Sequence, residues 1–532
     1  MTRTRSFSSW SVIALAIVAG CNRPRCGRKD PKDASVRDTT QFGADGASGG
    51  YKVQCSGWFP DWIARNPPGA NARSFQLAQG YPLGVPVLVE TPDGKLTIDR
   101  YDPYPPADDA VEAPWLPLDP KVAADQPAYL DALKAYLLDG HIGAASVEDD
   151  FDAQRNNKRS WFHVPMMTTS PFARREPYHG LTAERVLRAD DHKWIKNTAT
   201  TGLRSFAIGA YNWLGGYTIG RVFADPDPAA ADPSRAVFID GAFVFKLLFA
   251  EYDPAKIDAA QDPLIGAPEW RVQDVTNPTG PLVPVRLLQV DVAVRDPDAG
   301  PTGWVFATFV YDQAMVASSP WAKLRPVGLQ WGNGVGANLE TWLAPGIPAN
   351  LAREDGLPYG RDGRLNGPVD NPTSSCISCH STAQLITGIT GNSAAVVASA
   401  RGAGIFPPPA CTDAEDQVWF RNIAAGAPFG LMTSGGTGCA LAATQPATPP
   451  LVGLDYSLQL AEALESSLVR RNPNPCRATA EGLRDVAIVE APVGDASAMA
   501  AMRARLASKQ LREFGAERMK KLPRGLVRAQ AQ

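Results

Sequence analysis

The sequence predicts an α+β protein built around an antiparallel β-sheet, with an accessory N-terminal region and C-terminal helices. Four segments between residues 205 and 312 are rich in Val, Phe, Tyr and Ile and are separated by turns, as expected for strands joined in hairpins. Helical patterns with capping residues lie on both sides, at 126–140 and after residue 412. The 47 prolines and 47 glycines favour a turn-rich architecture with long loops.

The chain has 532 residues, and its length alone suggests about three domains. Its hydrophobic content of 44% supports a sizeable core, and its net charge of −3 argues against a general nucleic-acid binder. The changes of pattern along the chain predict a signal peptide at 1–20, a lipidated flexible tether at 21–55, an accessory domain at 56–180, a β-rich domain at 181–400, a helical extension at 401–494 and a basic helical tail at 495–532.

The N-terminus has the features of a bacterial export signal. Arg3 and Arg5 precede an apolar run, Trp10–Gly20, that is shorter than the roughly 20 residues needed to span a bilayer. The run ends in Val-Ala-Gly before Cys21, which resembles the lipobox of exported lipoproteins, whose cysteine becomes the diacylated N-terminus. Because Asn22 follows the cysteine, we expect an outer-membrane lipoprotein that faces the periplasm or the cell surface. An ordinary signal peptide cut nearby is the alternative.

Eight cysteines are divided between the N-terminal region and the second half of the chain. One is assigned to lipid and two to a motif described below, which leaves five. Disulfides are allowed in the oxidising periplasm, although the sequence does not fix their connectivity. The pairings considered are Cys26–Cys55 and one pair among Cys411, Cys439 and Cys476.

The accessory region 56–180 contains one clear helix signal. The segment QPAYLDALKAYLLDG has Pro127 in its first turn and Gly140 at its end, which are typical start and stop residues. A later aromatic stretch carries four side chains that can ligate haem iron, and ordinary packed or surface positions are the alternative for each of them. They are His163, Met166, Met167 and His179.

Two charged residues interrupt the apolar strand patterns of the β-rich region. Lys246 lies within AFVFKLLF, and Asp291 lies within LLQVDVAV. Because side chains alternate between the faces of a strand, Lys246 shares a face with Val244, and Asp291 shares one with Gln289. The alternatives are an edge-strand lysine that reaches water and an aspartate on a solvent-facing strand surface.

The second half of the chain is predicted to be loop-rich and then helical. Residues 313–375 are rich in Trp, Gly and Pro, and we interpret them as a long structured loop over the functional site. Helices are expected at TDAEDQVWFRNIAAG, where Thr412 and Glu415 form a capping box, and at DYSLQLAEALESSLVRRNPNP. The tail carries nine Lys/Arg against three Asp/Glu, which suits either a solvated helix or contact with anionic lipid.

The pentapeptide Cys376-Ile377-Ser378-Cys379-His380 matches the attachment signature of c-type haem, C-x-x-C-H. Two thiols one short turn apart can add to the two vinyl groups on one haem edge, and the adjacent His380 then ligates the iron. Zinc would need a second Cys or His pair at ligand spacing, and a thioredoxin-like C-x-x-C would follow a strand rather than the turn-rich RLNGPVDNPTSS. We therefore expect one covalent haem c per chain.

The order of these motifs carries a family resemblance. Strands with DGAFVFKLLF, VDVAVRDP and GWVFATFVYD precede CISCH, and this order resembles the cytochrome P-460 family, which includes the cytochromes c′-β. The resemblance implies a small antiparallel sheet that carries a single c-type haem, in place of the helical fold of most c cytochromes. It covers residues 205–312 and 376–380, roughly a fifth of the chain.

The resemblance also implies roles for individual residues. Cys376 and Cys379 match the thioether cysteines, and His380 matches the proximal ligand. Lys246 falls where hydroxylamine-oxidising members bond a lysine to the porphyrin edge, which would need a neutral amine, as burial favours. Asp291 falls where those members have a distal glutamate that accepts protons from substrate. The residues that fit the aromatic strand before the motif are Trp304, Phe306 and Phe309.

The sequence therefore predicts an exported, lipid-anchored monohaem cytochrome that binds hydroxylamine or nitric oxide at an open haem iron. Oxidation of hydroxylamine and binding of nitric oxide without oxidation are the two activities considered. Its expected partners are the small molecule, a periplasmic electron-transfer protein and the membrane. One alternative is a six-coordinate electron-transfer cytochrome c, with Met432 as the sixth ligand. The other is a surface lipoprotein in which haem is structural and region 56–180 binds a partner.

Overall fold

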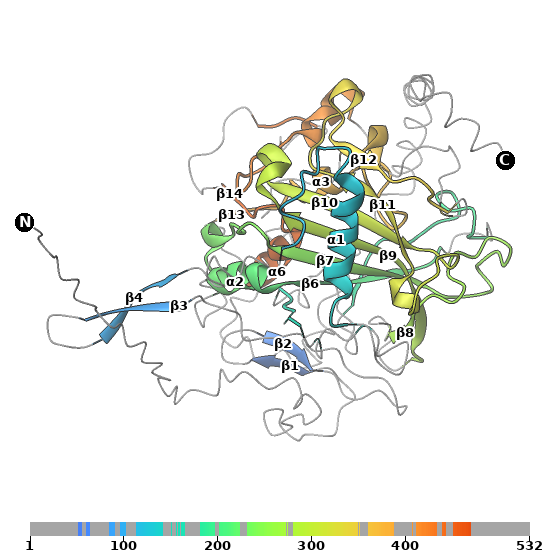
Figure 1. Ribbon diagram of the computed structural model, residues 1–532, viewed down its shortest axis with the longest axis horizontal. Coiled ribbons are helices and arrows are strands. Elements are labelled where there is room, and N and C mark those ends of the chain that lie inside the picture. Colours follow the sequence, from blue (N-terminus) through green and yellow to red (C-terminus); the bar gives the residue numbers. More distant parts are fainter. Residues whose placement is uncertain are drawn as a thin grey trace, which may run out of the picture.

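The computed structural model has an α+β architecture with one large antiparallel sheet, as the sequence predicts at this coarse level (Figure 1). It describes four strands before residue 103 and, with gaps, residues 113–469. The larger gaps lie within 142–180, 224–230, 352–359, 388–410 and 443–450. The predicted signal peptide, Cys21 and the basic tail fall outside the described residues, whereas the last four residues of the predicted tether form β1 (Lys52–Cys55).

The large sheet has the strand order β12-β11-β10-β9-β7-β6-β5, and β8 pairs with the first part of β9. Every neighbouring pair in it is antiparallel. Its strands are β5 (Thr182–Ala183), β6 (Ser205–Tyr211), β7 (Phe243–Glu251), β8 (Glu269–Val272), β9 (Val283–Arg295), β10 (Trp304–Tyr311), β11 (Leu324–Gln330) and β12 (Thr341–Leu343).

Three two-stranded sheets and several short helices complete the described elements. The small sheets pair β1 with β2 (Pro60–Ile63), β3 (Val85–Glu90) with β4 (Leu96–Asp102), and β13 (Gln384–Ile386) with β14 (Leu451–Gly453). The α-helices are α1 (Gln126–Leu138), α2 (Trp213–Val222), α3 (Cys376–His380), α5 (Asp413–Asp416) and α6 (Leu458–Val469). The 3-10 helices are η6 (Pro233–Arg235), η7 (Pro297–Thr302), η8 (Pro320–Ala322), η9 (Gly336–Asn338), η10 (Arg361–Gly363) and η11 (Gln417–Phe420).

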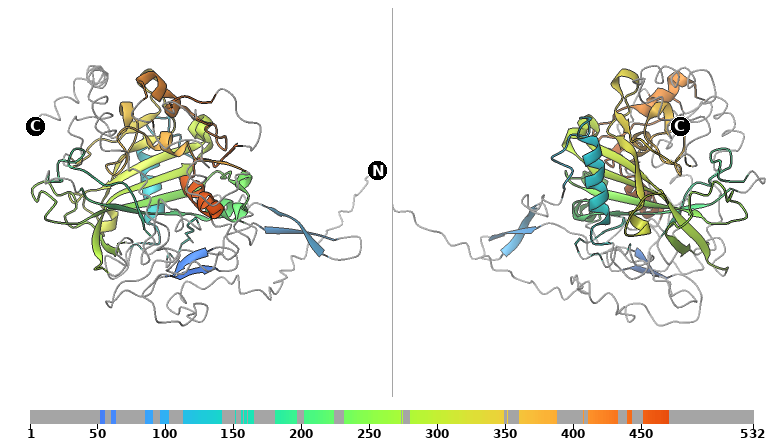
Figure 2. Two further views of the ribbon diagram at one scale, coloured as in Figure 1. Left: turned by 180° about the vertical axis from the view of Figure 1, so that it is seen from behind. Right: turned by 45° about the vertical axis from the view of Figure 1, so that its right-hand side comes forward.

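The two faces of the large sheet are covered by different parts of the chain. Figure 1 looks onto the face crossed by α1, and Figure 2 (left) looks onto the opposite face, where α6 lies. Alternation along β7 divides its side chains between the two layers: Phe243 and Phe245 pack with Trp115 and Leu133 on the α1 side, whereas Leu248 belongs to the core on the other side. The core on the side opposite α1 also contains α3 and α6, so the candidate site lies on that face of the sheet.

Helix α1 follows its sequence prediction and lies within the predicted accessory region. Pro127 stands in its first turn, and Gly140 beyond its end has a φ of 79°, which glycine adopts without a Cβ clash. The Tyr129 hydroxyl donates a hydrogen bond of 2.5 Å to Asp296, which follows β9. Residues 113–138 therefore share a core with the sheet of the predicted region 181–400.

Two segments differ from their predicted structure. The apolar segment after Ser205 is a strand only as far as Tyr211, because the Asn212 side chain accepts a hydrogen bond from Gly215 N at 3.1 Å and caps α2. The same oxygen also accepts from Phe243 N at 3.0 Å, which joins the cap to β7. The predicted loop 313–375 contributes β11 and β12, which extend the sheet beyond β10.

The C-terminal elements agree with the sequence signals but are shorter. Thr412 and Glu415 form the predicted capping box at the start of α5, which passes after one turn into η11. Helix α6 begins at Leu458, within the predicted helical segment. Cys411 pairs with Cys439 in a disulfide, one of the pairings considered. Within the described ranges, no helix is both long and apolar enough to cross a membrane.

The bond between Tyr129 and Asp296 gives a stability prediction. Both side chains are fully buried, so Tyr129→Phe leaves a buried carboxylate without one of its donors and should lower the free energy of unfolding by about 1–3 kcal/mol. Tyr252→Phe is the matched control, because Tyr252 makes the same kind of bond to Asp262 at 3.1 Å but is only half-buried. Denaturant unfolding should show the larger loss for Tyr129→Phe, and equal losses would contradict this account.

Candidate haem site

Helix α3 is a single turn that its own residues cap. The Ser375 hydroxyl accepts from Ser378 N at 3.0 Å, while the Ser378 hydroxyl accepts from Ser375 N at 2.8 Å. The turn is attached to the sheet side, since Ile377 N donates to Gln330 Oε1 at 3.3 Å and Ile377 is fully buried. Residues three apart lie on the same side of a helix, so the turn presents both of its cysteines together.

The two cysteines of α3 are free thiols, although the chain forms a disulfide elsewhere. Cys376 is buried and Cys379 is half-buried. Burial raises the pKa of the Cys379 thiol to about 12, and burial together with nearby carboxylates raises the pKa of Cys376 well above its usual range. Both thiols are therefore protonated at physiological pH.

His380 is held in the tautomer that a metal ligand needs. Its Nδ1 lies 2.8 Å from the carbonyl oxygen of Tyr456, and its ring packs against Phe306 with centroids 4.9 Å apart. A carbonyl only accepts, so Nδ1 carries the proton and Nε2 keeps its lone pair. Burial lowers the pKa of His380 to about 4, with Lys246 adding to the effect, so the imidazole is neutral at physiological pH.

A row of polar side chains crosses the sheet on the same face. Lys246 on β7 is paired in register with Asp291 on β9, and Asp291 is paired with Thr308 on β10. Gln289 lies on the same face as Asp291, as strand alternation predicts. Val244 packs against the core on the face that carries Lys246. Because β7 lies between β6 and β9, the edge-strand interpretation of Lys246 is wrong.

Asp291 belongs to a network with a second carboxylate. The Gln289 amide donates to both oxygens of Asp291, at 2.8 and 2.9 Å, and to Asp370 at 2.7 Å. The Thr308 hydroxyl donates to Asp291 at 2.8 Å. Burial and the neighbouring Asp370 raise the pKa of Asp291 to about 8, against the pull of these donors and of Lys246. Asp291 can therefore bind and release a proton near neutral pH.

Lys246 differs from the neutral amine that the sequence suggested. Its Nζ lies 3.0 Å from Glu184, which follows β5, and about a third of its side chain, 33%, stays accessible. Burial pulls its pKa down, but Glu184, Asp370 and Asp291 together outweigh burial and hold the pKa above its usual value. Three nearby carboxylates therefore favour the ammonium form of Lys246, whereas the family resemblance implies a neutral amine at this position.

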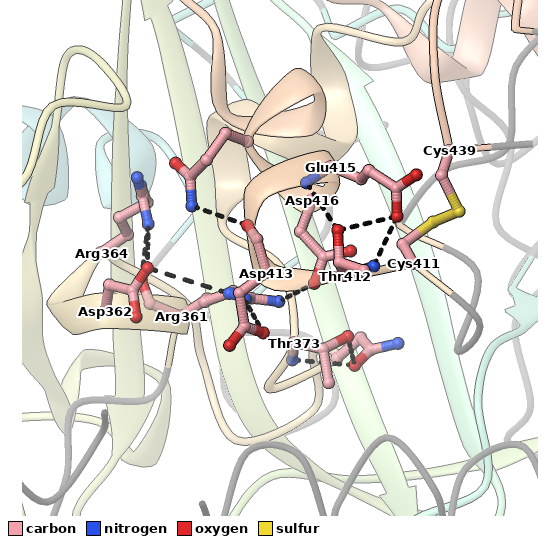
Figure 3. A network of polar contacts seen from close by, with 12 residues as sticks. Arg361, Asp362, Arg364, Thr373, Cys411, Thr412, Asp413, Glu415, Asp416 and Cys439 are labelled. Atoms are coloured by element: carbon pink, nitrogen blue, oxygen red, sulfur yellow. Dashed lines mark hydrogen bonds and ion pairs between the residues drawn. A yellow bond between two sulfur atoms is a disulfide. The ribbon is translucent and has the colours of Figure 1, made fainter. Parts of the chain in front are cut away.

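Ion pairs fix the segment that leads into α3 (Figure 3). Arg361 Nη1 lies 2.6 Å from Asp416 on α5, and both side chains are buried. Arg364, also buried, lies 3.1 Å from Asp362 and donates to the carbonyl of Asn333 at 2.8 Å. Loss of one partner of a buried pair costs about 3–5 kcal/mol, so this network holds residues 360–375 firmly against the α5 segment.

The residues of α3 and the polar row of the sheet lie close together. The thiols and His380 stand on one turn, and Asp291 and the Thr308 hydroxyl lie close enough to Cys376 to influence its pKa. Lys246, Asp291, Cys379 and His380 are only half-buried, so each keeps accessible surface that a planar group on α3 would cover. Among the described residues, no group of three or more His, Cys, Asp or Glu side chains is arranged to hold a metal ion.

Other predicted residues lie elsewhere or outside the described ranges. Trp304 and Phe306 belong to the core on the site's face, whereas Phe309 packs on the α1 side. Met432 forms an isolated bridge with Leu441 and packs, half-buried, at the edge of the core. His163 is buried in the accessory region. The residues outside the described ranges are Met166, Met167 and His179.

Four further residues complete the site and were not predicted. Glu184 follows a two-residue strand, Asp370 lies in a loop and Tyr456 in a turn, and none of these gives a periodic signal in the sequence. Gln289 was assigned to the correct face, but nothing in its surroundings indicated that it joins two carboxylates. No family model, no curated protein and no solved structure matches the chain, so the resemblance to the cytochrome P-460 family rests on its motifs alone.

The raised pKa of Asp291 gives a pH prediction. Its folded pKa of about 8 lies above the unfolded value of about 3.9, so the folded state binds the proton more tightly and loses stability as pH rises between these values. Asp291→Asn removes this pH-dependent proton binding. The free energy of unfolding of the variant minus that of the unmodified protein should therefore increase from pH 5 to pH 8.5. Asp298→Asn, at an exposed position of η7, is the control and should show no such trend. Parallel pH profiles for all three proteins would contradict the prediction.

Proposed function

We propose that this protein is an exported, lipid-anchored monohaem cytochrome c whose haem lies between α3 and the polar row of the sheet. The proposal rests on one observation: the turn Cys376–His380 lies on the face that carries Lys246 and Asp291. An electron-carrying or structural haem does not need ionisable groups beside the attachment motif. A haem that exchanges protons with a small ligand does need them.

Three residues of α3 would hold the haem. The S–H groups of Cys376 and Cys379 would add across its two vinyl groups, with sulfur bonding to one carbon and the proton going to the other. His380 offers Nε2 to the iron while Nδ1 stays hydrogen-bonded to Tyr456. The bound haem supplies an iron coordination position and a one-electron redox change.

The polar row supplies proton chemistry beside that position. Asp291 has a pKa near working pH, and Gln289 joins it to Asp370 by hydrogen bonds. The ammonium of Lys246 limits the repulsion between these carboxylates. Such a site suits a ligand that gains or loses protons as its redox state changes, and hydroxylamine or nitric oxide fits this description. Oxidation of hydroxylamine, with Asp291 as proton acceptor, is the proposed activity.

The same proposal covers location and partners. Cys21 as a lipidated residue would attach the protein to the outer membrane, facing the periplasm or the cell surface. Electrons removed from the ligand must leave the haem, so the proposal includes a periplasmic electron-transfer partner. The finer fold assignment, to the cytochrome P-460 and c′-β type, belongs to this proposal as well.

Covalent attachment is tested with paired cysteine variants. In cells that mature c-type haem, the protein should retain one haem after denaturation, and Cys376→Ser/Cys379→Ser should retain none. Cys411→Ser/Cys439→Ser is the matched control, since it removes two cysteines outside α3 and should keep covalent haem. The measurement is the pyridine haemochrome spectrum of denatured protein.

The reduced protein should also bind carbon monoxide, whereas a six-coordinate low-spin spectrum without such binding would contradict an open coordination position on the iron.

Lys246→Arg separates an electrostatic role from a covalent one. If Lys246 acts as a cation, arginine should preserve the absorption spectrum, whereas Lys246→Met should shift it and weaken ligand binding about 10-fold or more, as expected when buried carboxylates lose their counter-charge. Mass spectrometry of a tryptic digest should show free peptide 236–246 from the unmodified protein. A peptide containing Lys246 joined to haem would contradict the electrostatic role.

A further inference from the structure

We propose that Asp455 and Tyr456 form a positioning element that holds His380 in its ligand orientation and sets the reduction potential of the haem. This inference rests on the proposed function, because it assigns His380 to the iron. The element lies about 75 residues downstream of the haem motif, between β14 and α6. It consists of a strained backbone turn, the bonds that maintain it and one carbonyl group.

The strain lies in two consecutive residues. Asp455 has a φ of 47° and Tyr456 a φ of 65°, so both adopt the left-handed conformation that residues other than glycine rarely occupy. Such a conformation persists only where the surrounding structure imposes it, and it is concentrated at functional sites. Both residues are buried, with 1% and 5% of their surfaces exposed.

The Asp455 carboxylate supplies the restraint. It accepts hydrogen bonds from Phe238 N at 2.8 Å, from the Trp304 indole at 3.0 Å and from Gly426 N at 3.1 Å. Arg295 lies 3.8 Å away and provides a positive charge. These donors come from three separate segments of the chain, so the carboxylate fixes the turn to the end of the sheet.

The residues on either side are fixed as well. Leu454 N donates to Ala383 O at 2.9 Å, which joins the turn to the segment that follows α3. The Tyr456 hydroxyl donates to Ile423 O at 2.6 Å, and the Ser457 hydroxyl bonds with Tyr211 at 2.8 Å. The turn therefore cannot rotate as a unit without breaking several buried hydrogen bonds.

The functional consequence is the direction of one carbonyl group. The left-handed turn places the Tyr456 oxygen 2.8 Å from His380 Nδ1, opposite the nitrogen that would ligate the iron. A hydrogen bond at this position makes a histidine ligand more basic, which stabilises the oxidised metal and lowers its reduction potential. Asp455 thus acts on the iron through Tyr456 and His380 and is a positioning residue.

The experiment measures the midpoint potential of the full-length haem protein and the iron–histidine stretching frequency of its reduced form. Asp455→Ala should raise the potential and lower the frequency while covalent haem content stays the same. Asp455→Asn keeps an acceptor oxygen and should show a smaller shift in the same direction. Tyr129→Phe is the control, because it also loses a buried hydrogen bond but lies on the α1 face, so it should lose stability without a shift in potential.

The outcomes separate this inference from the proposed function. Unchanged potential and frequency in Asp455→Ala, with reduced stability, would overturn the inference and assign Asp455 a structural role only. If Asp455→Ala does not fold, the midpoint potential and the iron–histidine stretching frequency are measured on Asp455→Asn instead. An unshifted potential in Asp455→Asn would then overturn the inference. Failure of the unmodified protein to carry covalent haem would instead overturn the proposed function.

Discussion

The arrangement depends on one packing interaction, that of a single helical turn against a sheet face that carries charge. Ile377 is fully buried and attached to β11 through Gln330, which places Cys376 of α3 near Asp291 and Thr308. A buried charged face normally destabilises a fold, because charged groups lose hydration. Here the loops around α3, held by Arg361 and Arg364, maintain that contact (Figure 3).

Charge compensation explains why the polar row of the sheet combines carboxylates with a lysine. Asp291 and Asp370 lie close together, and Gln289 donates to both, so one amide satisfies two carboxylates. Lys246 offsets part of their charge and is itself paired with Glu184. Removing either sign of charge leaves the other uncompensated, which couples protonation of Asp291 to the electrostatics of the whole face. This coupling is the physical basis of the proton exchange that we propose for the site.

The sequence predicted the parts of this structure that leave a local pattern. Helix α1, the capping box of α5, the strands β7, β9 and β10, and the shared face of Gln289 and Asp291 follow from periodicity and capping signals. Short strands such as β5 and β12 were missed because two or three residues show no alternation. The ammonium state of Lys246 was missed because Glu184 and Asp370 are distant in sequence. The role of Tyr456 depends on a backbone conformation, which residue identity alone does not reveal.

The most direct test of the account is the mass of one peptide. Trypsin should release residues 365–401 as a single peptide that contains Cys376, Cys379 and His380. For protein exported from cells that mature c-type haem, the account predicts that this peptide carries the mass of one haem through two thioether bonds. A peptide with the mass of the polypeptide alone, or with a disulfide between its two cysteines, would contradict it.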